Sequence, residues 1–280
     1  MSRGLRGLVA GLLVFFGLLV FPLANLGIWT QRQVLDTGAF NDLSLSVLDE
    51  PAVRDALALR LVEEIVRAEP RLGPARVVLE PGVNQLLQTD VFRVVFSNAV
   101  GQMHTQLEQG ADELSLDLDG VLPLLRNAVG AVDTGAAGLI PSAAALPAIT
   151  VVSRDDVPEL WEGVQITREA SWAFPVVGLA LFAAAVAIAN RRARMLIVIG
   201  VGVAVLGFVQ VLLVRLGRDV LSDVTGRTAN VGAFTRGYDV VTESFVVQTV
   251  VLSVLGIVMA LAAGALLIVR QRNERPATWA

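Results

Sequence analysis

The amino-acid sequence predicts a mainly α-helical membrane protein with four transmembrane helices and a mostly helical extracytoplasmic domain that contains a small two-stranded parallel β element. Hydrophobic residues make up 54% of the 280 residues, above the ~45–50% typical of a soluble domain. Four apolar runs each approach the ~20 residues that cross a hydrocarbon core as a helix. Residues 30–171 instead place apolar side chains at helical spacing among polar ones, which is typical of a water-soluble domain.

The first apolar run occupies residues 7–29 and follows a short basic leader at residues 1–6. It is interrupted only by Pro22 and Asn25. A cleaved signal peptide is the alternative, but its apolar core would have about 7–15 residues, and Leu23-Ala24-Asn25 is a poor cleavage site. We therefore expect an uncleaved anchor.

The second and third runs, residues 172–189 and 195–214, predict a transmembrane hairpin whose tip, residues 190–194, is basic. Each arginine at a bilayer centre costs about 2.5–3.5 kcal/mol, so the tip must lie in water, and the positive-inside rule predicts that this water is cytoplasmic. The residues that determine this topology are Arg191, Arg192 and Arg194.

The orientation of the hairpin determines on which side of the membrane each of the other segments is expected to lie. Residues 215–244 are expected to form an outer loop with short helices, residues 245–269 the fourth span and residues 270–280 a cytoplasmic tail. Both termini are then cytoplasmic, and residues 30–171 lie outside the cell membrane. Residues 30–172 carry 21 Asp/Glu against 10 Arg, a net charge of −11, so the predicted outer domain is acidic.

Three helices are predicted at the start of this domain. The first begins near Asp49–Pro51 and repeats apolar residues every four positions through Ile65. The second covers residues 77–88, with an interruption expected near Pro81. The third starts at the Thr89/Asp90 cap, and its expected buried face consists of Val91, Val95, Ala99, Met103 and Leu107.

The pattern then changes to strict alternation over residues 113–119, which predicts a half-buried strand. Residues 120–132 return to helical spacing, and residues 135–147 form a Gly/Ala/Pro loop. Residues 148–152 are rich in β-branched side chains, which predicts a second strand. Strand, helix and strand in this order predict a crossover that joins two parallel strands. A final helix is expected from Ser153 towards Trp172.

Several of these segments together resemble a known family. They are Trp29, residues 33–37 (QVLDT), 49–65, 115–118 (SLDL), 149–156 and 172–269. This order is similar to that of uncharacterised four-helix integral membrane proteins of actinobacteria. The resemblance implies a multi-pass envelope protein with an extracytoplasmic domain, and it brings no functional residues with it.

The carboxylates of the first predicted strand are the weak candidates for a metal site: Glu113, Asp117 and Asp119. Calcium takes six to eight oxygen ligands, and the segment lacks the spaced ligands of a calcium-binding loop. A solvated strand face is the preferred interpretation, so we expect no metal and no cofactor. His104, the sole histidine, has no catalytic motif around it, and a packing role is expected.

The predicted spans carry only Asn25, Gln210 and Gln248 as strongly polar side chains. Ion-coupled transporters keep ionisable residues there, so a pump or antiporter is disfavoured, whereas a pore built by several copies stays open. Small residues at four-residue spacing predict close helix packing, within the bundle or between protomers. They are Gly7, Gly11, Gly200, Ala204, Gly256, Ala260 and Gly264.

The absence of cysteine excludes thiol catalysis and disulfides. The sequence also has no basic patch of the kind that binds nucleic acid, so we expect no nucleic-acid partner. We expect a non-enzymatic envelope protein whose acidic domain binds or scaffolds another envelope component. The expected partners are the lipid bilayer and a protein, or a second copy, that contacts the domain and the small-residue helix faces. A subunit of an oligomeric channel or transporter is the alternative, and an enzyme acting on lipid or cell wall has least support.

Overall fold

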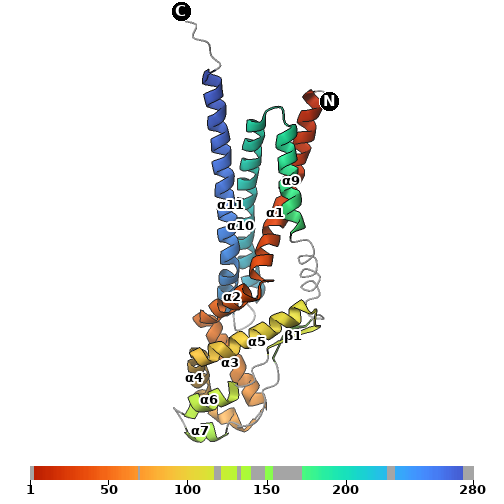
Figure 1. Cartoon of the computed structure of the whole chain (residues 1–280). Helices are drawn as coiled ribbons and strands as arrows, with labels where there is room; N and C mark the ends of the chain where they lie inside the picture. Colours follow the sequence, from red (N-terminus) through yellow and green to blue (C-terminus); the bar gives the residue numbers. More distant parts are fainter. Residues whose placement is uncertain are drawn as a thin grey trace, which may run out of the picture. The chain divides into compact units, whose positions relative to one another are not determined.

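A computed structural model describes residues 3–68, 70–116, 121–130, 134–139, 149–153, 172–225 and 231–273 (Figure 1). The chain divides into two compact units. We call Met1–Arg32, Gln165–Asp219 and Thr242–Ala280 the membrane unit, and Gln33–Val164 with Val220–Val241 the helical domain. Each unit is described by itself.

The membrane unit contains α1 (Arg3–Gln33), α9 (Ala173–Ile188) and most of α10 (Arg192–Thr225) and α11 (Val231–Asn273). The end of α10 from Val220 and the start of α11 up to Val241 belong to the helical domain. Three of these helices are long and apolar enough to cross a membrane, within Gly4–Gln33, Arg192–Val220 and Val231–Gln271. The chain is therefore a multi-pass, mainly α-helical membrane protein. The fourth, α9, has 16 residues, about 24 Å of helix, against a hydrocarbon thickness of about 30 Å.

The long helices extend beyond the apolar runs that predicted them. Helix α10 starts at Arg192, so Arg192 and Arg194 lie in its first turn and not in a loop. It continues to Thr225, and α11 begins at Val231, so most of the expected outer loop is helical. Residues 226–230 of this loop lie outside the described residues.

The helical domain begins with α2 (Thr37–Asp49), α3 (Pro51–Ala68), the 3₁₀ helix η1 (Pro70–Ala75), α4 (Arg76–Leu87) and α5 (Asp90–Glu108). The expected interruption of α4 does not occur, and Pro81 lies inside a continuous helix. Helix α2 has no counterpart in the sequence-based prediction. Its N-cap is Asp36, whose carboxylate accepts a hydrogen bond of 2.8 Å from the backbone N–H of Ala39.

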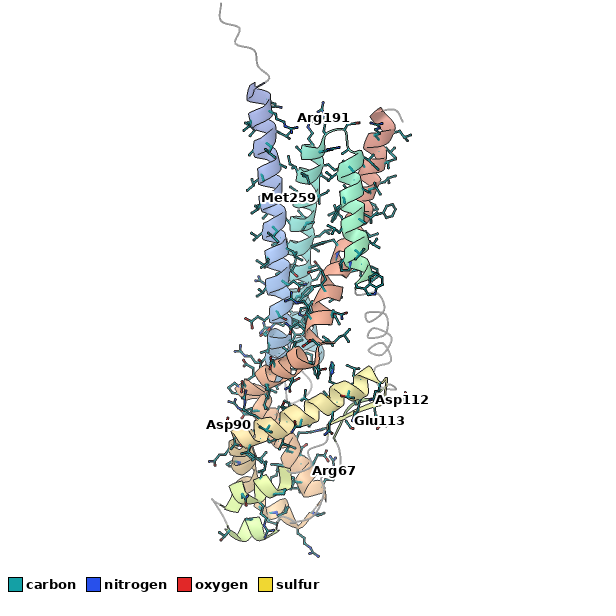
Figure 2. The ribbon with its side chains drawn as sticks, in the orientation of Figure 1. Arg67, Asp90, Asp112, Glu113, Arg191 and Met259 are labelled. Atoms are coloured by element: carbon teal, nitrogen blue, oxygen red, sulfur yellow. The ribbon has the colours of Figure 1, made fainter. Side chains whose placement is uncertain are left out.

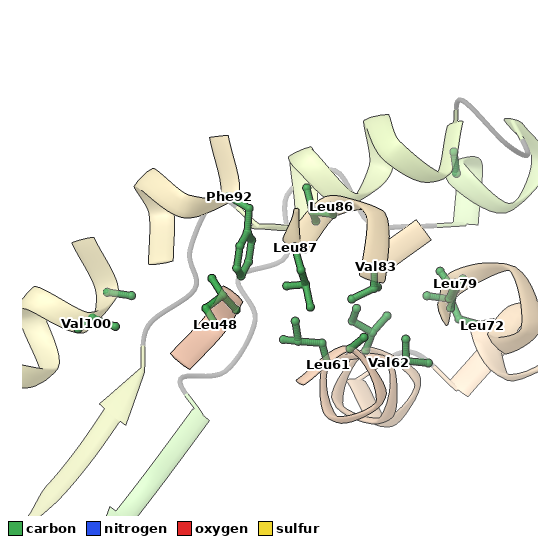
Figure 3. Packing of buried hydrophobic residues seen from close by; sticks show 14 residues of the cluster. Leu48, Leu61, Val62, Leu72, Leu79, Val83, Leu86, Leu87, Phe92 and Val100 are labelled. Atoms are coloured by element: carbon green, nitrogen blue, oxygen red, sulfur yellow. The ribbon is translucent and has the colours of Figure 1, made fainter. Parts of the chain in front are cut away.

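These helices pack around one apolar core (Figure 3). Leu48 of α2, Leu61 and Val62 of α3, and Phe92 and Val100 of α5 are almost completely buried. Helix α4 contributes four further side chains: Leu79, Val83, Leu86 and Leu87. All of these residues belong to the helical domain, so the domain has a hydrophobic core of its own.

The buried face of α5 agrees with the expected one at Ala99, which is 2% exposed, and differs from it at the start of the helix. Thr89 is the N-cap, as predicted, and accepts a hydrogen bond of 3.2 Å from the backbone N–H of Phe92. Val91, however, is 55% exposed, whereas Phe92 is fully buried and stacks on Phe96 with ring centroids 6.0 Å apart. The apolar face is therefore turned by about one residue, because the larger aromatic ring buries more apolar surface than valine does.

The two strands β1 (Glu113–Leu116) and β2 (Ile149–Ser153) form an antiparallel pair, so the parallel prediction is wrong. Glu113 lies opposite Ser153 and Leu116 opposite Ile149. A parallel pair was expected from a single crossover helix, but the connection holds both α6 (Val121–Gly130) and α7 (Thr134–Leu139). The additional element lets the chain reverse once more before β2. Helix α7 also replaces the first part of the predicted loop, whereas residues 140–148 and the predicted final helix at 154–171 lie outside the described residues.

Candidate functional site

The three amide side chains of the predicted spans, Asn25, Gln210 and Gln248, meet Thr249 in one cluster between α1, α10 and α11. The side-chain amide of Asn25 donates hydrogen bonds to Gln210 Oε1 at 3.2 Å and to Thr249 Oγ1 at 2.8 Å. Its carbonyl oxygen accepts one of 2.9 Å from Gln248 Nε2. Asn25 is 1% exposed and Thr249 is fully buried. We call these four residues the amide cluster.

Backbone carbonyls complete the amide cluster. Gln210 Nε2 donates to the carbonyl of Pro22 at 3.3 Å, and Gln248 Nε2 also donates to the carbonyl of Asn25 at 3.0 Å. The hydroxyl of Thr249 donates to the carbonyl of Phe245 at 2.7 Å. Because every member is an amide or a hydroxyl, the cluster is neutral and can join helices through hydrogen bonds. It offers no group that exchanges a proton near neutral pH.

A second contact between α1 and α11 follows one turn further along α1. The indole N–H of Trp29 donates to Ser244 Oγ at 2.8 Å, and its ring meets Phe245 edge-on with centroids 5.8 Å apart. The sequence pattern around Trp29 predicted no partner for its side chain. Ser244 and Thr249 were missed altogether, because single hydroxyls are common in membrane helices and carry no distinctive pattern.

The small residues predicted to pack helices divide into two groups. Gly200 of α10 faces Gly256 and Ala260 of α11, and a Cβ added to Gly200 would overlap the carbonyl oxygen of Gly256. A Cβ added to Gly256 would lie 2.7 Å from the carbonyl oxygen of Gly200 and 3.3 Å from the backbone nitrogen of Ala204. In contrast, three glycines have nothing within 4 Å of such a Cβ: Gly7, Gly11 and Gly264.

Further close contacts involve glycines that the four-residue spacing did not single out. A Cβ on Gly207 of α10 would overlap the hydroxyl of Ser253 on α11, and one on Gly202 would lie 2.6 Å from Leu18 of α1. Gly17 of α1 is similarly close to Phe182 of α9. The backbones in the membrane unit thus approach closely where one partner has no side chain, which is how transmembrane helices gain packing contacts.

The basic residues of the α9–α10 connection are exposed. Arg191 precedes α10, and Arg192 and Arg194 project from its first turn. Figure 2 labels Arg191 at this end of the helices. No ion pair to the three guanidinium groups is found among the residues that the structure describes. Cations at a helix N-terminus are unfavourably placed relative to the helix dipole, so local helix stability does not explain them.

His104 is buried inside the helical domain, at 1% exposure. Its Nε2 lies 2.9 Å from the carbonyl of Val34, and its Nδ1 lies 3.2 Å from the hydroxyl of Thr37. The ring of Phe40 stands 5.0 Å away, centroid to centroid. Because a carbonyl can only accept, Nε2 carries a proton, and the imidazole connects α5 to the segment before α2. The geometry assigns it a structural contact.

The carboxylates proposed as weak metal candidates do not form a site in the described part of the chain. Glu113 is exposed at the start of β1, next to Asp112 (Figure 2). Asp117 and Asp119 lie outside the described residues. Among the residues that are described, no group of three or more His, Cys, Asp or Glu side chains comes together as a metal site would require.

Comparison of the chain with protein families, with curated proteins and with solved structures finds no match. The resemblance to the actinobacterial membrane proteins therefore stays an expectation.

Proposed function

We propose that this chain is a non-enzymatic, multi-pass protein of the cell envelope, whose acidic helical domain binds or scaffolds another envelope component. The observation that carries the proposal is the separate core of the helical domain, which packs around Leu61, Val83 and Phe92. A folded domain attached to membrane helices holds a recognition surface at a fixed place in the envelope. The excess of carboxylates over arginines in residues 30–172 favours a partner with a basic surface.

In this proposal α9 is a fourth span. Its 16 residues are preceded by Trp172, and the basic connection at residues 189–191 follows them. Shortfalls of a few ångströms in span length are accommodated by local thinning of the bilayer, at fractions of a kcal/mol per ångström. With four spans, both termini lie on the same side of the membrane as the arginine connection, and the positive-inside rule assigns that side to the cytoplasm and the helical domain to the outside.

The amide cluster supports this function over the channel alternative. Asn25 directs its amide and its carbonyl oxygen to protein groups, and Thr249 does the same with its hydroxyl. Groups that line a water-filled path keep hydrogen-bonding capacity for water or ions. A cluster whose buried members, Asn25 and Thr249, hydrogen-bond to other groups of the protein is better suited to holding the helices together.

The orientation can be tested with single cysteines, because the native chain has none. Glu80→Cys on α4 and Asn190→Cys in the arginine connection change exposed residues. Intact cells treated with a membrane-impermeant maleimide are expected to label position 80 and to spare position 190, while lysed cells label both. Labelling of position 190 alone in intact cells would reverse the orientation and remove the proposed role.

Partner binding can be tested by photo-crosslinking from the surface of the helical domain. Val91 and Val94 of α5 are 55% and 61% exposed and lie on one face of the helix. A photoreactive amino acid at Val94 is expected to capture a discrete envelope component, identified by mass spectrometry. The matched control carries the same group at Val247, an exposed residue of α11. A crosslinking pattern at Val94 that contains only lipid would contradict the proposed role.

A further inference from the structure

An apolar groove of about 840 Å³ opens on the membrane unit between α9, α10 and α11. Its floor is one face of α10, where Leu196, Ile199 and Val203 recur at helical spacing. Phe182 of α9 forms one wall, and Met259 of α11, labelled in Figure 2, forms the other. The walls of the groove are thus hydrocarbon along almost their whole length.

Arg192 is the one charged residue among those that line the groove, and it lies at one end of the floor. From Arg192 to Val203 the floor covers twelve residues of α10, which rise by about 16 Å at 1.5 Å per residue. One leaflet contributes half of the hydrocarbon thickness of about 30 Å. The groove therefore has the length of one leaflet, with its cation at the depth of the headgroups.

The environment of Arg192 favours an anion. Its side chain is exposed, and no carboxylate forms an ion pair with it in the described part of the chain. Arg191 and Arg194 stand beside it and line a separate cavity of about 370 Å³ next to Gly7 of α1. A phosphate at this position would meet both the guanidinium group and the N-terminal end of the α10 dipole.

The distribution of charge favours a lipid over a helix of a second copy as the occupant. The groove has one cation at one end and hydrocarbon along the rest of its walls, which matches a charged headgroup joined to an acyl chain. Lipid chains also adapt to an irregular apolar wall.

We propose that this groove binds one anionic phospholipid, with an acyl chain along α10 and its phosphate at Arg192. The inference rests on the placement of α9, α10 and α11 in the membrane and is independent of what the helical domain binds. The lipid would fill the space between α9 and α11 and so stabilise the position of α9.

Native mass spectrometry of the full chain, released from nanodiscs, tests this proposal. The nanodiscs contain equal amounts of phosphatidylglycerol and phosphatidylcholine with identical acyl chains. The wild-type chain is expected to retain one phosphatidylglycerol, with a preference of about fivefold over phosphatidylcholine, the factor expected for one arginine near an anionic headgroup. Arg192→Gln is expected to abolish the preference, whereas Arg270→Gln, which removes an exposed arginine of α11 outside the groove, preserves it.

A second pair of variants tests the groove itself. Ala183 lines the groove on α9, so Ala183→Phe is expected to reduce retention of both lipids. Ala265→Phe adds the same ring to an exposed position of α11, on the helix face away from Gly256, and is expected to have no effect. Equal retention of the two lipids by the wild type, or an unchanged preference in Arg192→Gln, would overturn the proposal even if Ala183→Phe fails to fold. The proposal would also be overturned if the wild type were detected as a lipid-free complex of two chains and Ala183→Phe reduced it to a single chain.

Discussion

Asn25 needs hydrogen-bond partners among the neighbouring helices, which no apolar side chain of α1 needs. Its side chain contacts Gln210 of α10 and both Gln248 and Thr249 of α11. The sequence identifies Asn25, Gln210 and Gln248 as the polar residues of the spans, but Asn25 and Gln210 are 185 residues apart. Whether they meet depends on how each helix is rotated, and apolar runs with little periodicity do not specify that rotation.

Replacing Asn25 with leucine is expected to lower the free energy of unfolding by about 1–2 kcal/mol. The substitution leaves the amide of Gln248 without its side-chain acceptor, and interhelical hydrogen bonds in membranes are each worth about 0.6 kcal/mol, with a maximum near 1.7. Titration of the purified chain from mild detergent into SDS measures the change. Leu23→Ala on the lipid-exposed face of α1 is the control, and an equal loss there would show that the amide contributes nothing specific.

Gly200 and Gly264 provide a matched pair for helix packing. Alanine favours a helix interior over glycine by roughly 0.5–1 kcal/mol, so Gly264→Ala, with open space around its Cβ, is expected to be neutral or stabilising. Gly200→Ala places a methyl group against Gly256, and such overpacking costs about 1–3 kcal/mol. The thermal midpoint in detergent is expected to fall for Gly200→Ala only. A fall of the same size in both variants would contradict the contact.

The β pair shows how a pattern can be recognised and then misinterpreted. Alternation over residues 113–116 correctly predicted a half-buried strand, in which Leu114 is buried and Glu113 exposed. That same alternation is typical of antiparallel sheets with one wet face, whereas parallel strands are usually apolar on both faces. The order strand, helix, strand nevertheless led to the parallel prediction. Helix α7 could not be predicted, because Thr134–Leu139 is short and contains two glycines.

The antiparallel register predicts which cysteine pair can form a disulfide. Glu113 and Ser153 are direct partners, and the Cα atoms of antiparallel partners are about 4.5–5.5 Å apart, within the range of a disulfide. Glu113→Cys with Ser153→Cys is expected to crosslink on mild oxidation, as detected by protease digestion and mass spectrometry. Glu113→Cys with Ile149→Cys, about 13 Å apart along the strand, is the control. Crosslinking of the control pair alone would support the parallel arrangement.

The helices of the domain were predictable where apolar spacing and a cap coincide. Thr89 and the residues after it specified α5, although the choice between Val91 and Phe92 as the buried residue depended on packing. Helix α2 was not predicted despite the Asp36 cap and the apolar residues Phe40 and Leu48, because its glycine, asparagine, aspartate and serine residues have low helical propensity. Its stability comes from tertiary contacts such as the burial of Leu48 in the core of the domain.

For the whole chain, the arginines of the α9–α10 connection determine the predicted orientation in the membrane, although their charge is unfavourable at the N-terminus of α10. The changes Arg191→Gln, Arg192→Gln and Arg194→Gln together leave Arg215 and Arg218 as the nearest basic residues, at the opposite end of the predicted span. With Asn190→Cys as the reporter, the combined variant is expected to become accessible to external maleimide in a substantial fraction of molecules.

The matched control for this experiment carries Arg215→Gln and Arg218→Gln with the same reporter. It strengthens the charge difference and is expected to keep position 190 protected in intact cells. If neutralising the three inner arginines leaves the reporter fully protected, charge does not determine the orientation, and the placement of the helical domain would need another cause.

The amide cluster also bears on how the protein is made. Asn25 leaves the ribosome before its partners, because Gln210 and Thr249 follow 185 and 224 residues later. At about 5–20 residues per second, translation reaches Gln210 about 10–40 s after Asn25. During that interval the amide of Asn25 must find water, lipid headgroups or an insertion factor. Completion of the bundle is thus a late event of biosynthesis, and chains truncated before α11 would lack the partners that Gln248 and Thr249 supply to Asn25.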